Sequence, residues 1–336
     1  MRQTFNDAVP LMRQVRVAVV GAGLFGLEHI ASYRVLAEVE LVGVVEPDEA
    51  RRFALVSSGA VPSTLPLFSS VREMLAAGEV DAASIVVPSR LHAAVASELM
   101  AAGVDILVEK PFTETVDDAQ QIAREAAQLG RVCLPGHVLR FSPQHQALRA
   151  RIRAKTMGDV IAVALRRDRS RVLTMSHAGE HPASLTGVHD IDLAIWLTGQ
   201  RVAEVRASEH RMSDGHGIDL FWAELLHVDG AMSSIRGAYL LPADTPDATS
   251  DQIDVYGSTD IETLHDETPR RGGSKSAGNA AETHNVPLMN ELAHFVACVA
   301  AGTPSSICKP EDAIHVVEVV HAVIQSAAAG GIPVAL

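Results

Sequence analysis

The chain is poor in positive charge. Its 336 residues contain 28 Lys and Arg against 41 Asp and Glu, which gives a formal net charge of -13. Nucleic-acid binding relies on basic surface to neutralise phosphates, and the one larger basic cluster, 166–171, is interrupted by Asp168. The balance argues against a nucleic-acid partner. The cluster indicates a solvated strand end, with an interface or an anionic substrate such as a sugar acid or sugar phosphate as alternatives.

Cysteine is also scarce. Cys133, Cys298 and Cys308 are the only three, and no two of them form a C-x-x-C pair. This spacing offers no disulfide framework and argues against structural zinc, so we expect no metal and a reducing, cytoplasmic location. The chain has no apolar run long enough to span a bilayer, and residues 1–12 lack the apolar core of a signal peptide. We therefore expect no contact with a membrane.

The first part of the chain alternates apolar and amphipathic segments. Strands are predicted at 15–20, 41–45, 82–87, 105–108 and 131–134, with helices between them at 24–36, 71–77, 91–102 and 116–129. Strands that alternate with helices form a parallel sheet covered on both faces. The pattern predicts an α/β protein whose first domain, residues 14–138, is a doubly wound Rossmann sheet.

The second part has a different pattern. Strands are predicted at 160–166, 202–208, 220–227, 231–238 and 252–257, and helices at 143–154, 288–301 and 311–329. Consecutive strands without intervening helices favour antiparallel pairing. We therefore predict an α+β domain over residues 139–336 with a largely antiparallel open sheet, and a surface loop at 266–282, which is polar and glycine-rich.

A glycine-rich turn follows the first predicted strand, where residues 21–26 read G-x-G-x-x-G. The first glycine permits a tight turn, the second lets the backbone approach a pyrophosphate, and the third lets the helix pack on the strand with its N-terminus toward the phosphates. The second strand ends in Glu46, 25 residues after Gly21, near the spacing of a ribose-binding acid. These features predict a dinucleotide held by Gly21, Gly23, Leu24, Phe25, Gly26 and Glu46.

The residues after the second strand bear on the choice of cofactor. Glu46 would accept hydrogen bonds from the adenosine ribose and repel a 2′-phosphate, and Asp48 adds negative charge. Arg51 and Arg52 could reach a phosphate from the first turn of the next helix, although a solvated helix face is the other interpretation. The pattern favours NAD over NADP.

The ends of the later strands indicate the reaction centre. In a doubly wound sheet ligands bind at the carboxyl ends of the strands. We therefore expect further cofactor-binding residues there, namely Pro88, His92, Glu109 and Lys110. Lys110 directly follows the fourth predicted strand, and Pro111 restricts its backbone. The Lys110 amine could exchange a proton with a substrate hydroxyl as hydride moves to or from a nicotinamide. A salt bridge to Glu109 at the surface is the structural alternative.

Two further segments carry candidate polar side chains. In the predicted helix around 187–196, His189, Asp192 and Trp196 share a face by their spacing, so Asp192 could orient His189 as a proton carrier. A packing role for His189 is the alternative. Arg140 could bind a substrate carboxylate or phosphate, or anchor the domain boundary. Asp192 is also expected to bind substrate.

These motifs together resemble the glucose-fructose oxidoreductase, inositol dehydrogenase and rhizopine catabolism (Gfo/Idh/MocA) family. The resemblance rests on the glycine turn and on the segments 88–92, 109–111, 140–143, 187–192, 290–295 and 310–313. It implies a nicotinamide cofactor, a sugar, cyclitol or related polyol or sugar-acid substrate, and a homodimer or homotetramer assembled through the second sheet. It also implies that Lys110 matches the family's catalytic lysine and His189 its histidine.

One position departs from the family pattern. The family usually has an aspartate four residues before the histidine, and this chain has Leu185. A leucine cannot orient an imidazole or relay a proton, so Asp192, Glu180 or His181 is expected to substitute, with His181 supplying a second imidazole to the substrate site. Two alternatives to a dehydrogenase stay open. The resemblance allows NAD-assisted glycoside elimination or hydrolysis, and the departure at Leu185 favours a non-catalytic NAD-binding regulator.

Overall fold

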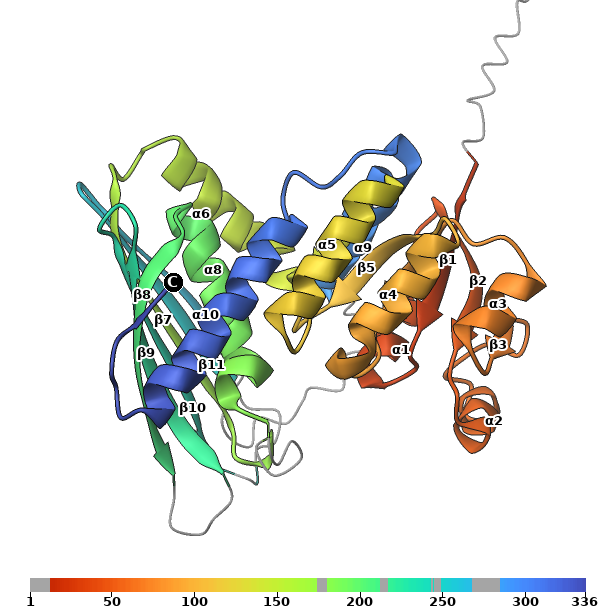
Figure 1. The fold of residues 1–336 in the computed structure, drawn as a ribbon, viewed down its shortest axis with the longest axis horizontal. Coiled ribbons are helices and arrows are strands. Elements are labelled where there is room, and N and C mark those ends of the chain that lie inside the picture. Colours follow the sequence, from red (N-terminus) through yellow and green to blue (C-terminus); the bar gives the residue numbers. More distant parts are fainter. Residues whose placement is uncertain (1–12, 174–179, 212–216, 243, 245–248, 268–284) are drawn as a thin grey trace, which may run out of the picture.

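The computed structural model describes residues 13–173, 180–211, 217–242, 244, 249–267 and 285–336, and these form two β-sheets with helices packed on them (Figure 1). The first sheet is parallel throughout and lies in the N-terminal part. The second is mixed and mostly antiparallel. The predicted fold class is therefore confirmed.

The first sheet has six strands in the order β3-β2-β1-β4-β5-β6. They are β1 (Val15–Val20), β2 (Val39–Val45), β3 (Leu67–Phe68), β4 (Ala82–Ile85), β5 (Asp105–Glu109) and β6 (Cys133–Gly136). The strand order reverses between β1 and β4, and this is where doubly wound sheets bind their ligands. The glycine turn after β1 lies at this switch point.

Helices cover both faces of the first sheet because its strands are apolar on both sides. Val17 and Val19 point into one core, with α1 (Leu24–Tyr33) and α2 (Glu49–Ser57). The alternate residues Ala18 and Val20 point into the other core. That second core includes α3 (Val71–Ala77), α4 (His92–Ala101) and α5 (Val116–Leu129).

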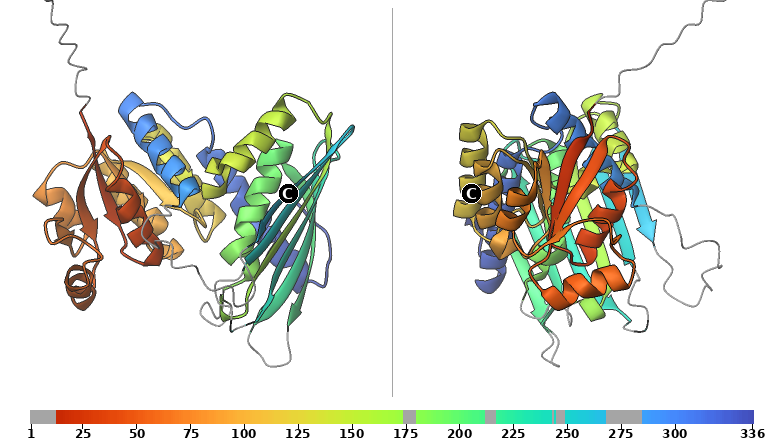
Figure 2. Two further views of the ribbon diagram at one scale, coloured as in Figure 1. Left: turned by 180° about the vertical axis from the view of Figure 1, so that it is seen from behind. Right: turned by 90° about the vertical axis from the view of Figure 1, so that its right-hand side faces the viewer.

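The second sheet has seven strands in the order β12-β11-β7-β10-β9-β8-β13. They are β7 (Val160–Ser170), β8 (Val202–Arg211), β9 (Ile218–His227), β10 (Met232–Leu241), β11 (Thr249–Gly257), β12 (Ile261–Glu267) and β13 (Val334–Ala335). Its only parallel pair is β7 with β10, among the described residues. The helices α6 (Pro143–Arg153), α8 (Val188–Thr198) and α10 (Pro310–Ala328) pack on the face turned toward the first sheet (Figure 2).

The helix α9 (Val286–Ala301) follows the second sheet in the chain but packs on the first sheet. Its apolar residues Leu288, Leu292 and Phe295 are fully buried in the core of the first sheet, beside Val17 and Ile30. The core of the first domain therefore includes a segment from outside residues 14–138, because the chain crosses back after the second sheet.

Four of these helices and strands were not predicted: α2, β3, β12 and the two-residue strand β13. The helix α2 begins after Asp48, whose side chain caps it by accepting from the Arg51 backbone N–H, but only Leu55 of this helix is buried. The strand β3 is too short to give a pattern. The strand β12 lies at a sheet edge and is rich in polar residues, and it overlaps the first residues of the loop predicted at 266–282. The rest of that loop lies outside the described residues.

Candidate active-site cleft

The glycine turn has the geometry that its sequence predicts. Gly21 has a φ of +104°, and a Cβ there would lie 2.5 Å from the Val86 carbonyl oxygen. A Cβ on Gly26 would lie 2.1 Å from the carbonyl oxygen of Gly21. Neither position accepts a larger residue, so both glycines are required for α1 to start this close to β1 and β4.

Gly23 differs from the other two glycines. It has a φ of -64°, and a Cβ there would meet nothing within 4 Å. The fold itself therefore does not require glycine at this position, whereas a pyrophosphate lying against the N-terminus of α1 would. The open space beside Gly23, which a Cβ would fill, fits the pyrophosphate of a dinucleotide.

Gly23→Ala is therefore expected to leave the thermal unfolding midpoint nearly unchanged and to weaken NAD binding by about tenfold or more. Isothermal titration calorimetry measures the binding and circular dichroism the unfolding. Gly26→Ala is the contrasting variant and should lose stability as well. Equal NAD affinity in Gly23→Ala and the unmodified protein would place the pyrophosphate elsewhere.

The predicted ribose acid Glu46 lies directly after β2 and is almost fully buried. Its Oε1 accepts the Asp48 backbone N–H at 3.1 Å, and its Oε2 lies 3.4 Å from Nε of Arg51. The Arg51 guanidinium also donates to the Ala22 carbonyl in the glycine turn at 2.8 Å. Arg51 therefore bridges the acid and the turn, whereas Arg52 donates to the carbonyl oxygens of Glu46 and Pro47.

Lys110 lies at the end of β5 and lines two cavities. The first cavity, about 470 Å³, is lined by Phe25, Val86, Val87, Glu109, Lys110, Val138, Leu139, Arg167, His189 and Asn285. The second, about 560 Å³, shares Val87 and Lys110 and extends over Pro88, His181, Leu185 and α10. The first adjoins the glycine turn through Phe25, while Leu24 is largely exposed.

The Lys110 amine is held by one hydrogen bond, which it donates to the Leu185 carbonyl at 3.1 Å. Burial lowers the pKa of Lys110, the neighbouring Glu109 raises it, and Arg167 lowers it further. The residue at the family's aspartate position therefore orients the lysine through its backbone. The surface salt bridge with Glu109 is not formed, because the Glu109 carboxylate binds His29 and the Lys110 backbone N–H instead.

His189 lines the first cavity beside Lys110 and has no hydrogen-bond partner within the described part of the chain. Burial holds its pKa well below the ordinary value, and the positive charges of Lys110 and Arg167 lower it further. The imidazole is neutral near pH 7 and is available to exchange a proton or a hydrogen bond with a ligand in this cavity.

Asp192 does not orient His189, contrary to the expectation from spacing. It is 1% exposed and binds Arg140, also 1% exposed, through Nε and Nη2 at 2.7 to 3.1 Å. Arg140 donates in addition to Asp312 at 2.8 Å and to the Ile307 carbonyl at 2.9 Å. The substrate contacts expected of Arg140 and Asp192 are thus replaced by contacts between them.

His181 lies on the wall of the second cavity and is already paired. Its Nδ1 accepts the Ala183 backbone N–H at 3.0 Å, so Nε2 carries the proton and donates to Glu209 at 3.1 Å. Burial lowers the pKa of His181. The His181 imidazole thus lines the second cavity with Lys110, whereas His189 lines the first.

Pro88 lies in the connection between β4 and α4, and His92 is the first residue of α4. His92 is buried, and its two ring nitrogens lie 3.1 and 2.9 Å from the carbonyl oxygens of Phe112 and Val87. The ring therefore braces the loops after β4 and β5, and only Pro88 of the two lines a cavity.

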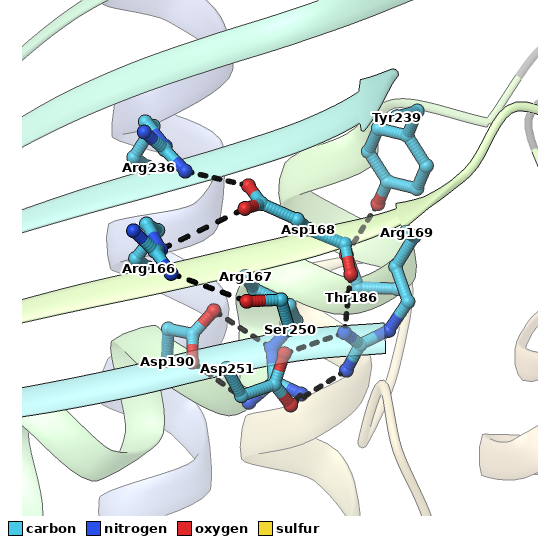
Figure 3. Close-up of polar contacts among 10 residues, drawn as sticks. All are labelled: Arg166, Arg167, Asp168, Arg169, Thr186, Asp190, Arg236, Tyr239, Ser250 and Asp251. Atoms are coloured by element: carbon cyan, nitrogen blue, oxygen red, sulfur yellow. Dashed lines mark hydrogen bonds and ion pairs between the residues drawn. The ribbon is translucent and has the colours of Figure 1, made fainter. Parts of the chain in front are cut away.

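Arg167 belongs to the basic cluster 166–171, which was predicted to be a solvated strand end, but its side chain is buried and lies in the cleft. It lines the first cavity and binds Asp190 through two hydrogen bonds of 2.9 and 2.8 Å, and Asp251 through one of 2.9 Å (Figure 3). Arg169 pairs with the same Asp251. The alternation of side chains along β7 could have predicted this position, because Val163, Leu165 and Arg167 all face inward. A charged residue at a core position of a strand needs a partner or a function.

Comparison with known proteins identifies the family. A model described as an oxidoreductase family with an NAD-binding Rossmann fold, GFO_IDH_MocA, matches residues 15–137, and the GFO/IDH/MocA C-terminal domain matches residues 145–260. These matches cover more than half of the chain, and the chain belongs to the Gfo/Idh/MocA oxidoreductase family.

Individual relatives are distant. The rhizopine catabolism protein MocA of Rhizobium meliloti is 32% identical over 200 residues, which are 59% of this chain and 61% of MocA. Inositol 2-dehydrogenase 1 of Saccharopolyspora erythraea is 28% identical over 199 residues, 59% of this chain and 58% of the relative. The chain thus spans about three fifths of the length of the curated relatives it matches.

A solved structure extends the likeness to the whole fold. Myo-inositol 2-dehydrogenase from Lactobacillus plantarum superposes with a TM-score of 0.82 at 19% identity, covering 96% of this chain and 100% of that chain. At this identity the likeness shows the fold alone. Within the described residues, no helix is both long and apolar enough to cross a membrane.

Proposed function

We propose that the protein is an NAD-dependent oxidoreductase that oxidises or forms a CH–OH group on a sugar, cyclitol or related polyol. The observation that carries the proposal is the position of Lys110. Its amine lies on the wall common to two cavities, one of which joins the glycine turn and contains His189. A nicotinamide bound there would supply the hydride acceptor or donor.

Lys110 and His189 divide the proton chemistry in this proposal. With its pKa lowered by burial, Lys110 has a larger neutral fraction than an exposed lysine and can accept the proton of a substrate hydroxyl. The neutral His189 lies on the same cavity and can hold the substrate oxygen or pass the proton on. The Leu185 carbonyl orients the Lys110 amine but cannot take its proton, so the relay ends at an imidazole or at solvent.

NAD is the proposed cofactor because Glu46 stands at the ribose position. A ribose with free hydroxyls would take the place of Arg51 on the Glu46 carboxylate. A 2′-phosphate would face the same carboxylate, with Arg51 close enough to offset part of the repulsion. We therefore propose that NAD binds more tightly and that NADP is accepted more weakly.

A neutral polyol is favoured over an anionic substrate by the pairing of the arginines. Arg167 and Arg169 are each bound to acids, Asp190 and Asp251 (Figure 3). Their charges are thus largely offset within the protein. The names of the relatives support the same substrate class, since inositol is itself a cyclitol.

The test is NADH absorbance with purified protein, NAD or NADP, and a panel of polyols, sugars and sugar acids. A rise with NAD on at least one polyol is expected, and a smaller rise with NADP. NAD binding without turnover on any substrate would contradict the dehydrogenase proposal. Cleavage of a glycoside without net NADH formation would favour the elimination alternative instead.

We further propose that copies of the chain associate through the outer face of the second sheet. This face carries the partly exposed apolar side chains of Trp222, Leu226, Met232 and Tyr256, and a hollow of about 520 Å³ lies among β7, β8, β9 and β10. Light scattering should give a dimer or tetramer. Trp222→Glu should shift the measured molar mass toward that of a monomer. A monomeric unmodified protein would contradict the proposed interface.

A further inference from the structure

A row of three rings runs along one side of the cofactor-binding helix α1. Phe25, His29 and Tyr33 are four residues apart, and the ring centroids are 5.2 Å apart in the first pair and 6.3 Å in the second. Phe25 lines the first cavity, whereas His29 and Tyr33 are 0% exposed. Tyr33 is anchored to the Ser84 hydroxyl at 2.7 Å. The middle ring, His29, lies between the other two and lines neither cavity.

His29 contacts the carboxylate that precedes the candidate catalytic lysine. Its Nε2 lies 3.1 Å from Oε1 of Glu109, and the other oxygen of Glu109 accepts the Lys110 backbone N–H at 3.0 Å. Glu109 thus has one donor on each oxygen, which are the His29 ring on α1 and the backbone N–H of Lys110. The contact links the helix that holds the cofactor to the strand end that holds Lys110.

A second buried acid, Glu291, interacts electrostatically with Glu109. Glu291 on α9 is 0% exposed, and neither of its oxygens has a hydrogen-bond partner among the described residues. Burial raises the pKa of Glu291 well above the ordinary value, and the negative charges of Glu109 and Asp192 raise it further. Burial and these charges therefore favour the neutral form of Glu291, whereas both oxygens of Glu109 lie within hydrogen-bond distance of a donor.

We propose that His29 is a positioning residue for Lys110: it holds the Glu109 carboxylate in place, and this carboxylate sets the charge environment of the lysine amine. The proposal rests on the proposed role of Lys110 in proton transfer. The groups facing Glu109 are His29 and Tyr33 from α1, Glu291 from α9 and His137 before α6. Those facing Lys110 are Glu109, Glu180, Arg167 and His189.

The direction of the effect follows from these contacts. Without the His29 donor, Glu109 would be left with an unpaired buried oxygen next to a second carboxyl group, so it would take up a proton or turn away. Either change removes negative charge from beside Lys110. Because Glu109 raises the pKa of Lys110, the loss of His29 must lower it.

The lysine can be observed directly because the chain has only four, Lys110, Lys155, Lys275 and Lys309. In protein labelled with ¹³C at lysine Cε, the four signals can be titrated by NMR, and Lys110→Arg identifies the signal of interest. His29→Phe should lower the Lys110 midpoint by about one pH unit. His29→Gln, whose amide can donate from a similar position, should restore most of it. Tyr33→Phe, the matched control on the same helix, should leave it unchanged.

Two results would overturn the proposal: an unchanged Lys110 midpoint in folded His29→Phe, or an equal shift in Tyr33→Phe. If His29→Phe fails to fold, Glu109→Gln takes its place, and an unchanged midpoint there is equally decisive. The titration needs neither cofactor nor substrate, so its outcome is separate from that of the NADH assay. A Lys110 midpoint that responds to His29 in a protein without turnover would reject the proposed function and leave the positioning contact standing.

Discussion

Lys110→Ala is expected to lower kcat by about 10²- to 10⁴-fold, the range for removing a positioned general acid or base. Lys110 is the only amine on the two cavities among the described residues, and its hydrogen bond to the Leu185 carbonyl fixes it there. NAD binding should change little, because the glycine turn and Glu46 are untouched. The measurement pairs NADH absorbance with calorimetric titration of NAD.

Lys110→Arg separates charge from proton transfer. Arginine keeps the positive charge but does not deprotonate in the accessible pH range, so this variant should be nearly as impaired as Lys110→Ala. Lys309→Ala is the matched control, since Lys309 is exposed at the start of α10 and touches neither cavity. Near-normal turnover in Lys110→Arg would give the lysine an electrostatic role and move the proton transfer to an imidazole.

The pH dependence of alcohol oxidation has a defined sign. The base form of Lys110 is the neutral amine, and burial lowers the pKa of this group below that of an ordinary lysine. The rate should therefore rise with pH through that lowered pKa and level off above it. A pH profile of kcat that falls over the same range would show that the protonated lysine is the active form in this direction.

The sequence predicts well those features that depend on neighbouring residues. The six residues of the glycine turn, the apolar strand before it and Glu46 after β2 lie as expected because each follows from a short local pattern. Lys110 was placed correctly at the end of β5 for the same reason. For Gly23 the structure adds a distinction that the sequence cannot make. It separates a glycine that the fold requires from one that it does not.

For the helix α8, the spacing of polar residues did not predict which side chains meet. Spacing placed Asp192 with His189, but α8 is buried on nearly every side, so it has no single apolar face from which to infer orientation. Asp190 meets Arg167 from β7, and Asp192 meets Arg140 from the segment before α6. Both partners are distant in the sequence, and no local pattern encodes such pairs.

Arg140→Leu is expected to lower the free energy of unfolding by about 3 to 5 kcal/mol, because it leaves the Asp192 carboxylate buried without its partner. Among the described residues, Asp192 would keep only His137, 3.4 Å away, whose pKa is itself lowered by burial. Urea denaturation followed by circular dichroism measures the loss. The exposed pair Lys155 and Asp159 is the control, and Lys155→Ala should cost less than about 1 kcal/mol.

The double variant Arg140→Leu/Asp192→Leu tests the reason for that loss. If the cost lies in an unpaired buried charge, removing both charges should recover much of it, since apolar replacements of buried ion pairs are often close to neutral. The remaining partner, Asp312, is 40% exposed and can be solvated. If Arg140 instead binds substrate, the single variant would raise KM and leave unfolding nearly unchanged. The two roles therefore predict opposite results in the same pair of measurements, and the 1% exposure of both side chains favours the structural one.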